Sequence, residues 1–304
     1  MTTHSHAHVH NDVQGNYNRA FVIGVALNTA FVIIEVVYGL SANSLALLSD
    51  AGHNLSDVMG LLLAWGALKL SRSRPTARRT YGLRWSSILA ALANAAMLLF
   101  VTGAITVEAV RRLFNPAPVA AFTIMWVAAI GVLINGATAA MFVSGRKTDI
   151  NIRGAFAHMA SDALIALGVV VAGFLIRATG WLWLDPAVSI GIGLVIAVAT
   201  WSLLRESVNL AMDAVPENVD AATVESFLCS VDGVEAVHDL HIWAMSTTET
   251  ALTAHVVAPE GLNDEALSAM RTELHEHFRI AHCTIQVERG DTDHPCAQED
   301  EAAV

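Results

Sequence analysis

Two histidine–aspartate pairs with identical spacing are the residues of this chain best suited to chemistry. His53 and Asp57, in SDAGHNLSDV, are four positions apart, and His158 and Asp162, in AHMASDAL, repeat that spacing. Side chains at i and i+4 lie on the same face of an α-helix. Two imidazoles and two carboxylates form a four-ligand shell that suits Zn²⁺, and the two carboxylates neutralise its charge. The spacing therefore predicts one metal site built from two helices.

Both pairs lie in segments that are otherwise apolar. An unaccompanied aspartate at the middle of a membrane costs about 2.5–3.5 kcal/mol on insertion scales, so we expect a metal ion or a proton beside it. The alternative interpretation is polar packing between helices, which we favour for Glu35 in the first apolar segment. Asp50, one turn before His53, is an auxiliary candidate; capping its helix or lining an entrance explains it equally well.

The elements that must position these pairs are transmembrane helices. The chain has 304 residues, of which 54% are hydrophobic and 15% charged. A helix needs about 20 apolar residues to cross the hydrocarbon layer. The segments that meet this requirement are residues 20–40, 44–70, 86–109, 119–143, 154–177 and 186–205. We therefore predict an α-helical membrane protein with a six-helix bundle over residues 19–206, embedded in a lipid bilayer.

The basic residues predict the orientation of this bundle. Most of the lysines and arginines before Glu206 fall on the side of the two termini, and by the positive-inside rule that side is cytoplasmic. The residues on this side are Arg19, Lys69, Arg72, Arg74, Arg78, Arg79, Arg84, Arg146, Lys147, Arg153 and Arg205, against Arg111, Arg112 and Arg177 on the other. Residues 1–18, with HSHAHVH, are expected to form a cytoplasmic tail that collects zinc at most as an auxiliary.

The chain from Glu206 onward is expected to be a separate, water-soluble domain. It has 20 acidic and 3 basic side chains, a net charge of −17, and we expect no nucleic-acid partner. Hydrophobic periodicity predicts helices over 220–231 and 263–278 and strands over 235–244, 249–259 and 283–289, which is an αββαβ order. We place this domain at 207–290 and a flexible tail at 291–304. Three cysteines without a disulfide framework indicate a reducing compartment.

Several motifs together resemble the cation diffusion facilitator family, and most closely its zinc branch of the bacterial cobalt–zinc–cadmium resistance type. They are SNSLALLSDAGHNLSDV, TYGLRW, NIRGAFAHMASDAL, HDLHIW and TAHV, in this order. The resemblance implies a homodimeric exporter with a metallochaperone-like cytoplasmic domain, in a bacterial inner membrane, that exchanges divalent cations for protons. It assigns His53, Asp57, His158 and Asp162 to the transport site. The loop SRSRPTARRT has no histidine, aspartate or glutamate, so the loop site of some members should be absent.

A second metal site is expected in the soluble domain. A turn near Ser246–Thr247 would set His238 opposite His255, about 4.5–5.5 Å away. His282 and Glu288 flank the last strand and match metal-binding positions of the resembled family. The predicted ligands are therefore His238, His255, His282 and Glu288, with His241 as an auxiliary candidate and His294 and Cys296 as a further clamp. Surface histidines without a metal are the competing interpretation.

The leading hypothesis is a zinc/proton antiporter that exports Zn²⁺, and not an enzyme. An intramembrane zinc hydrolase needs an open coordination position and a general base, and the chain contains no HExxH. Two alternatives stay open. The same site could export Co²⁺, Ni²⁺ or Cd²⁺, or the protein could be a membrane-tethered metal sensor without flux.

Overall fold

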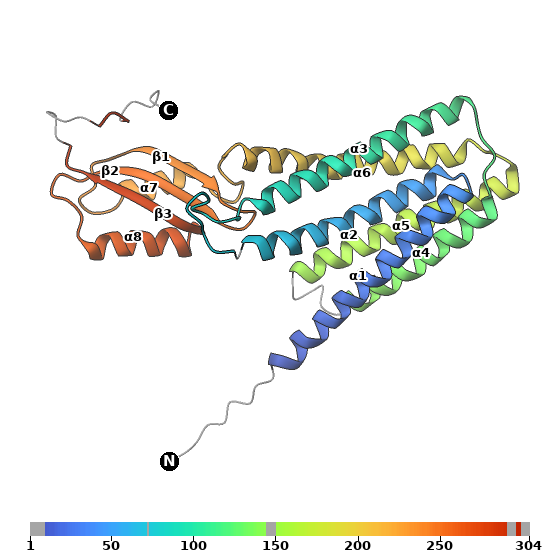
Figure 1. Cartoon of the computed structure of the whole chain (residues 1–304), viewed down its shortest axis with the longest axis horizontal. Coiled ribbons are helices and arrows are strands. Elements are labelled where there is room, and N and C mark those ends of the chain that lie inside the picture. The colour runs from blue at the N-terminus through green and yellow to red at the C-terminus, as the bar shows by residue number, and fades with distance from the viewer. Residues whose placement is uncertain (1–9, 72, 144–149, 291–295, 299–304) are drawn as a thin grey trace, which may run out of the picture. The chain divides into compact units, whose positions relative to one another are not determined.

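The computed structural model describes residues 10–71, 73–143, 150–290 and 296–298. Six long helices come first, followed by a small mixed domain (Figure 1), so the predicted six-helix bundle with an αββαβ domain is confirmed. The long helices are α1 (His10–Ser41), α2 (Leu45–Ser71), α3 (Ser86–Phe114), α4 (Ala121–Phe142), α5 (Ile150–Thr179) and α6 (Leu184–Ala211). The domain contains α7 (Ala221–Cys229), β1 (Ala236–Ala244), β2 (Thr250–Val257), α8 (Asp264–Glu276) and β3 (Ile280–Glu288).

Among the described residues, four helical segments are long and apolar enough to cross a membrane: α3, α4, Phe156–Thr179 of α5, and α6. Residues Ala26–Ser41 of α1 form a shorter apolar helix. Large apolar side chains on these helices point outward, including Leu133, Leu194 and Val198. Exposed apolar side chains around helices whose backbone groups are internally bonded are what a lipid environment requires.

The chain divides into two compact units, Met1–Leu61 with Asn94–Trp201 and Leu62–Ala93 with Ser202–Val304. In the first unit α4 packs along α5, and α1 contacts α4 (Figure 1). Small residues allow this close approach: a methyl group at Gly173 of α5 would lie 2.8 Å from Cγ of Met125 on α4. Glycine at such interfaces lets helix backbones come together where no hydrophobic effect drives association.

The N-terminus of α2 is fastened to the N-terminus of α6 by one buried carboxylate. Asp185, only 1% exposed, accepts a hydrogen bond from the hydroxyl of Ser44. It also accepts the backbone N–H groups of Leu45, at 2.8 Å, and Ala46, at 3.3 Å. These N–H groups have no partner within their own helix, and a negative charge is favoured at a helix N-terminus. Asp185 therefore caps α2 from a distant part of the chain.

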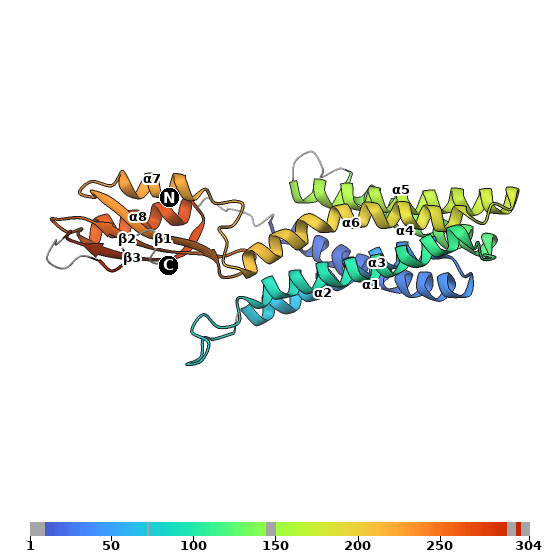
Figure 2. The same ribbon diagram turned by 90° about the horizontal axis from the view of Figure 1, so that it is seen from above.

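The second unit contains a three-stranded sheet in the order β1-β2-β3, with β1 antiparallel and β2–β3 parallel. Helices α7 and α8 cover one face of this sheet (Figure 2). The core between them includes Leu228 and Leu274 from the helices and Leu252 and Val256 from β2. Because side chains alternate along a strand, His255 of β2 lies on the opposite face, away from the helices.

Candidate metal centres

The two histidine–aspartate pairs converge in the first unit. His53 and Asp57 come from α2 and His158 and Asp162 from α5, and one ligand atom from each lies within 4.8 Å of all the others. Nε2 of His53 is 3.2 Å from Oδ1 of Asp162, and Nε2 of His158 is 3.3 Å from Oδ2 of Asp57. The structure thus brings together the four residues that the spacing singled out.

These distances suit a small tetrahedral cation. Within each helix the imidazole–carboxylate distances are 3.8 Å for His53–Asp57 and 3.7 Å for His158–Asp162. Zn²⁺ with ligands at about 2.0–2.1 Å in tetrahedral geometry sets its ligand atoms about 3.3–3.4 Å apart. The contacts across the helices already have that length, and those within the helices exceed it by less than about 0.5 Å. A contraction of that size would bring the four imidazole–carboxylate distances to the tetrahedral value.

Burial differs strongly within this group. The side chain of Asp162 is 1% exposed and that of His158 is 42% exposed. Oδ2 of Asp57 and Oδ2 of Asp162 are buried and, among the described residues, have no hydrogen-bond partner. A cation between the two helices would satisfy both oxygens, and it would reach them from the side of His158.

Asp50, the auxiliary candidate, lies outside this four-residue group. It is 1% exposed and next to the carboxyl group of Glu35 of α1. Nδ2 of Asn54 donates a hydrogen bond of 2.9 Å to Oε2 of Glu35, so the interhelical bonding expected for Glu35 is confirmed.

A second group of potential ligands lies on the open face of the sheet. His238 of β1 pairs directly with His255 of β2, as predicted, and their rings are 5.2 Å apart. Glu288, the last residue of β3, contacts both: Oε2 is 3.3 Å from Nε2 of His238 and Oε1 is 3.0 Å from Nδ1 of His255. Cys296 completes the group, with all four ligand atoms within 4.8 Å.

The Glu288 carboxyl is held in its charged form. Its partial desolvation favours the neutral acid, but hydrogen bonds from Cys296 and Gln286 and the charges of His238 and His255 outweigh this, so its pKa lies below the ordinary value. An ionised carboxylate between two imidazoles is ready to accept a cation.

His282 is not brought to this group. It faces Ala251, while Glu288 faces Val257 at the other end of the parallel pair. Six residues of strand separate His282 from Glu288 by about 20 Å, and the ring of His282 packs against Tyr81 at 5.8 Å. Nε2 of His241 lies 2.9 Å from Oδ1 of Asp239, a carboxylate oxygen that accepts a hydrogen bond from it, and His241 lies outside the four-residue group.

Some predicted residues fall outside the described part of the chain. They are the HSHAHVH residues before position 10, Arg72, Arg146, Lys147 and His294.

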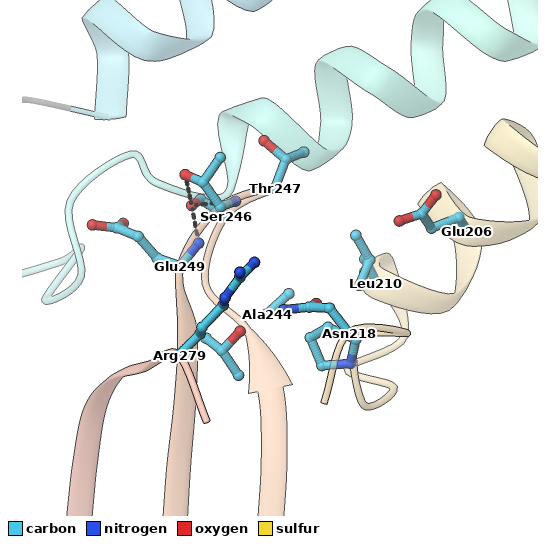
Figure 3. Close-up of a pocket in the computed structure, with 11 residues that line it drawn as sticks. Glu206, Leu210, Asn218, Ala244, Ser246, Thr247, Glu249 and Arg279 are labelled. Carbon is cyan, nitrogen blue, oxygen red and sulfur yellow. Dashed lines mark hydrogen bonds between the residues drawn. The ribbon is translucent and has the colours of Figure 1, made fainter. Parts of the chain in front are cut away.

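The second unit also contains a polar pocket of about 370 Å³ between the end of α6 and the β1–β2 turn (Figure 3). Arg279 and Glu249 border it, and the hydroxyl of Ser246 accepts the N–H groups of Thr248 and Glu249. No metal-ligand group was found here among the described residues.

The β1–β2 turn is attached to the start of α3. Nη1 of Arg84 is 3.0 Å from Oε2 of Glu249, and the N–H of Thr247 donates to Oγ of Ser87 at 3.0 Å. Ile88 of α3, Leu210 of α6 and Ala244 of β1 form a small buried cluster beside these bonds. The sheet is therefore joined to two of the long helices.

Both the membrane helices and the small mixed domain match known protein families. A family model described as the cation efflux transmembrane domain matches residues 21–210, and one described as the cation efflux protein, cytoplasmic domain, matches residues 216–290. The chain belongs to the cation efflux family. This cation efflux protein is consequently a membrane transporter of metal cations and not an enzyme, as the sequence predicted.

Curated relatives of this cation efflux protein cover most of its length. The metal cation efflux system protein CzcD of Cupriavidus metallidurans is 38% identical over 301 residues, covering 98% of this chain and 92% of that protein. The cadmium, cobalt and zinc/H⁺-K⁺ antiporter of Bacillus subtilis is 35% identical, covering 92% of this chain and 91% of its own length. The zinc transporter ZitB of Escherichia coli is 35% identical, and the match covers 94% of this chain and 92% of that protein.

A solved structure, the metal-bound C-terminal domain of the CzcD transporter from C. metallidurans, shares 42% identity with this chain. The match covers 23% of this chain and 99% of the solved domain, with a TM-score of 0.22.

Proposed function

We propose that this cation efflux protein exports Zn²⁺ from the cytoplasm in exchange for protons, through a site formed by His53, Asp57, His158 and Asp162. The observation that carries this proposal is the convergence of the four ligand atoms within 4.8 Å of one another. Two imidazole nitrogens and two carboxylate oxygens in a compact arrangement favour tetrahedral Zn²⁺.

The donor set also bears on the choice of ion. Two imidazoles disfavour Mn²⁺, which prefers oxygen ligands, whereas Co²⁺, Ni²⁺ and Cd²⁺ are also compatible with such a site. The name of the E. coli relative specifies zinc, and that of the B. subtilis relative specifies cadmium, cobalt and zinc. Export of Co²⁺, Ni²⁺ or Cd²⁺ through the same residues is therefore the closest alternative.

Charge balance supports coupling to protons. With Zn²⁺ bound, the two aspartates neutralise the ion. Without it, two carboxylates in a protein interior repel each other, and the site gains by taking up protons. Histidine, whose unperturbed pKa is about 6.5, exchanges protons readily near neutral pH. Protons entering from outside would then displace zinc outward, and the name of the B. subtilis relative includes H⁺ exchange.

The orientation follows from the same proposal. We place both termini in the cytoplasm, in the plasma membrane of a bacterium, because the lysines and arginines are concentrated in the loops on that side. Within this arrangement residues 19–206 form the transmembrane domain in the bilayer, 207–290 the cytoplasmic domain, and 1–18 and 291–304 the terminal tails.

We further propose that the cytoplasmic domain binds a regulatory metal ion through His238, His255 and Glu288 and forms a homodimer. The match of residues 216–290 to the cytoplasmic dimerisation domain of the family supports the dimer. The net charge of −17 from Glu206 onward makes two facing copies of the domain repel each other until cations neutralise them. Metal binding would draw the copies together, and the attachment of the sheet to α3 and α6 offers a route to the membrane helices.

Flux measurements test the transport proposal. Proteoliposomes containing a pH-sensitive dye should show zinc movement with opposite proton movement, and zinc movement should stop when the pH gradient is collapsed. Cadmium is measured in parallel to establish the ion preference. Asp57→Ala should abolish flux. Zinc movement at an unchanged rate without a gradient would contradict proton coupling, and zinc binding without any flux would support the metal-sensor alternative.

A further inference from the structure

The C-terminal tail contributes a thiol to the group on the open face of the sheet. Cys296 lies beyond the end of β3, yet its Sγ is 3.4 Å from Nδ1 of His255. The other two cysteines are placed differently: Cys229 is exposed on α7, and Cys283 packs from β3 against the core under the helices. Of the three thiols, only Cys296 lies within the ligand group.

Without this thiol the group is incomplete. His238, His255 and Glu288 supply three ligands, whereas closed structural zinc sites use four. Nε2 of His238 is buried and has no hydrogen-bond partner among the described residues, although Oε2 of Glu288 lies 3.3 Å away. A cation between His238, Glu288 and Cys296 would give this imidazole nitrogen a partner.

A β-bulge in β1 positions Asp239 next to this ligand group. The β1–β2 register shifts between His238 and His241, and Asp239, inside the shift, has a φ of +49°. Aspartate tolerates this left-handed backbone conformation better than most residues. The bulge brings Oδ2 of Asp239 to 3.5 Å from Nε2 of His255. A carboxylate behind a metal-binding histidine holds the ring so that the other nitrogen, here Nδ1, faces the ion.

We propose that Cys296 is a metal ligand, so that a residue beyond the end of β3 closes a His₂GluCys site on the open face of the sheet. This inference rests on the cytoplasmic metal site proposed above and adds its fourth ligand. On binding, the Cys296 thiol loses its proton to solvent and the thiolate bonds to the cation. Glu288 and the thiolate together neutralise a divalent ion.

The thiolate changes which ions this site recognises. Sulfur ligands favour zinc and other soft cations, whereas the transport site has only nitrogen and oxygen donors. Asp239, whose Oδ2 lies 3.5 Å from Nε2 of His255, acts as a positioning residue for this site.

Cobalt spectroscopy of the full-length protein tests this proposal. In a reduced Asp57→Asn/Asp162→Asn background, Co²⁺ should give visible ligand-field bands of a tetrahedral site together with a near-ultraviolet sulfur-to-cobalt charge-transfer band. Adding Cys296→Ser should remove the charge-transfer band and weaken cobalt binding by at least about tenfold. The matched controls Cys229→Ser and Cys283→Ser should retain the band. Asp239→Asn should retain it too, with binding weakened about 10- to 100-fold.

Three results would overturn the proposal, and they are distinguishable. Ligand-field bands without a charge-transfer band would leave the cytoplasmic site but exclude its thiolate. A band that survives Cys296→Ser would assign the sulfur ligand to another cysteine. Absence of bound cobalt in this background would contradict the cytoplasmic site itself, and with it the role of Cys296.

Discussion

Replacing Asp162 by asparagine should weaken zinc binding more than any other single change in the transport site. The substitution keeps the size of the side chain but removes its charge. Asp162 is the most buried of the four residues, at 1% exposure, with oxygens 3.2 Å from His53 and 3.7 Å from His158. Water therefore cannot replace the lost charge, and a dication would be left with one carboxylate for two charges.

The magnitude follows from this burial. Removing one member of a buried, bonded charge pair costs about 3–5 kcal/mol. At about 1.4 kcal/mol per tenfold change, the zinc affinity should fall by about two to three and a half orders of magnitude. Asp57 is 23% exposed, so solvent screens its charge better. Asp57→Asn should therefore cause a smaller loss, on the order of ten- to a hundredfold.

The assay is zinc titration of the purified full-length protein, combined with zinc uptake into proteoliposomes. Glu108→Gln is the matched control: it also removes one carboxylate, but Glu108 is 43% exposed and pairs with Arg112 at 3.1 Å. Its zinc affinity should stay within about twofold, since exposed ion pairs contribute little. An Asp162→Asn protein that folds normally and binds zinc within threefold of the native affinity would refute the reasoning. A larger loss for Asp57→Asn would refute the argument from burial.

Other substitutions separate the roles of further residues. His53→Asp, which replaces nitrogen by oxygen, should lower the ratio of zinc to cadmium uptake; an unchanged ratio would exclude His53 as a ligand. Asp50→Ala should retain part of the zinc flux, because Asp50 lies outside the ligand group, and complete loss would place it in the transport path. Leu252→Ala, at a fully buried position of β2, should destabilise the cytoplasmic domain by about 2–5 kcal/mol in urea unfolding of the full chain. Arg84→Ala should lower the free energy of unfolding by less than about 1 kcal/mol in the same measurement. Arg84 is 39% exposed and its partner Glu249 is 36% exposed, so solvent screens this ion pair.

Helical and strand periodicity made much of the two groups of potential ligands predictable. A spacing of four residues puts His53 and Asp57 on one face wherever the segment is helical, and the repeat at His158 then points to a common site. The facing of His238 and His255 followed from a short antiparallel hairpin, in which the turn determines the register.

The features that could not be predicted depend on long-range arrangement. The segment around His282 and Glu288 is recognisable as a strand, but nothing local says that it runs parallel to β2, which places only Glu288 beside His255. From the sequence, Cys296 is predicted only as a further clamp with His294, because it follows the last strand in a segment without periodicity; its position beside His255 depends on the tertiary structure. The only local signal at Asp239 is a residue type that accepts a positive φ.

The capping of α2 by Asp185 makes the N-terminus of that helix a fulcrum. His53 is eight residues from Leu45, about 12 Å along the helix, and Asp57 is about 18 Å away. A tilt of about 5° around the capped end would displace their backbones by roughly 1 Å and 1.5 Å, given the rise of about 1.5 Å per residue. Bonds between zinc and its ligands tolerate changes of only about 0.2 Å. A tilt of α2 by a few degrees about its capped N-terminus is therefore enough to form or disrupt the coordination shell.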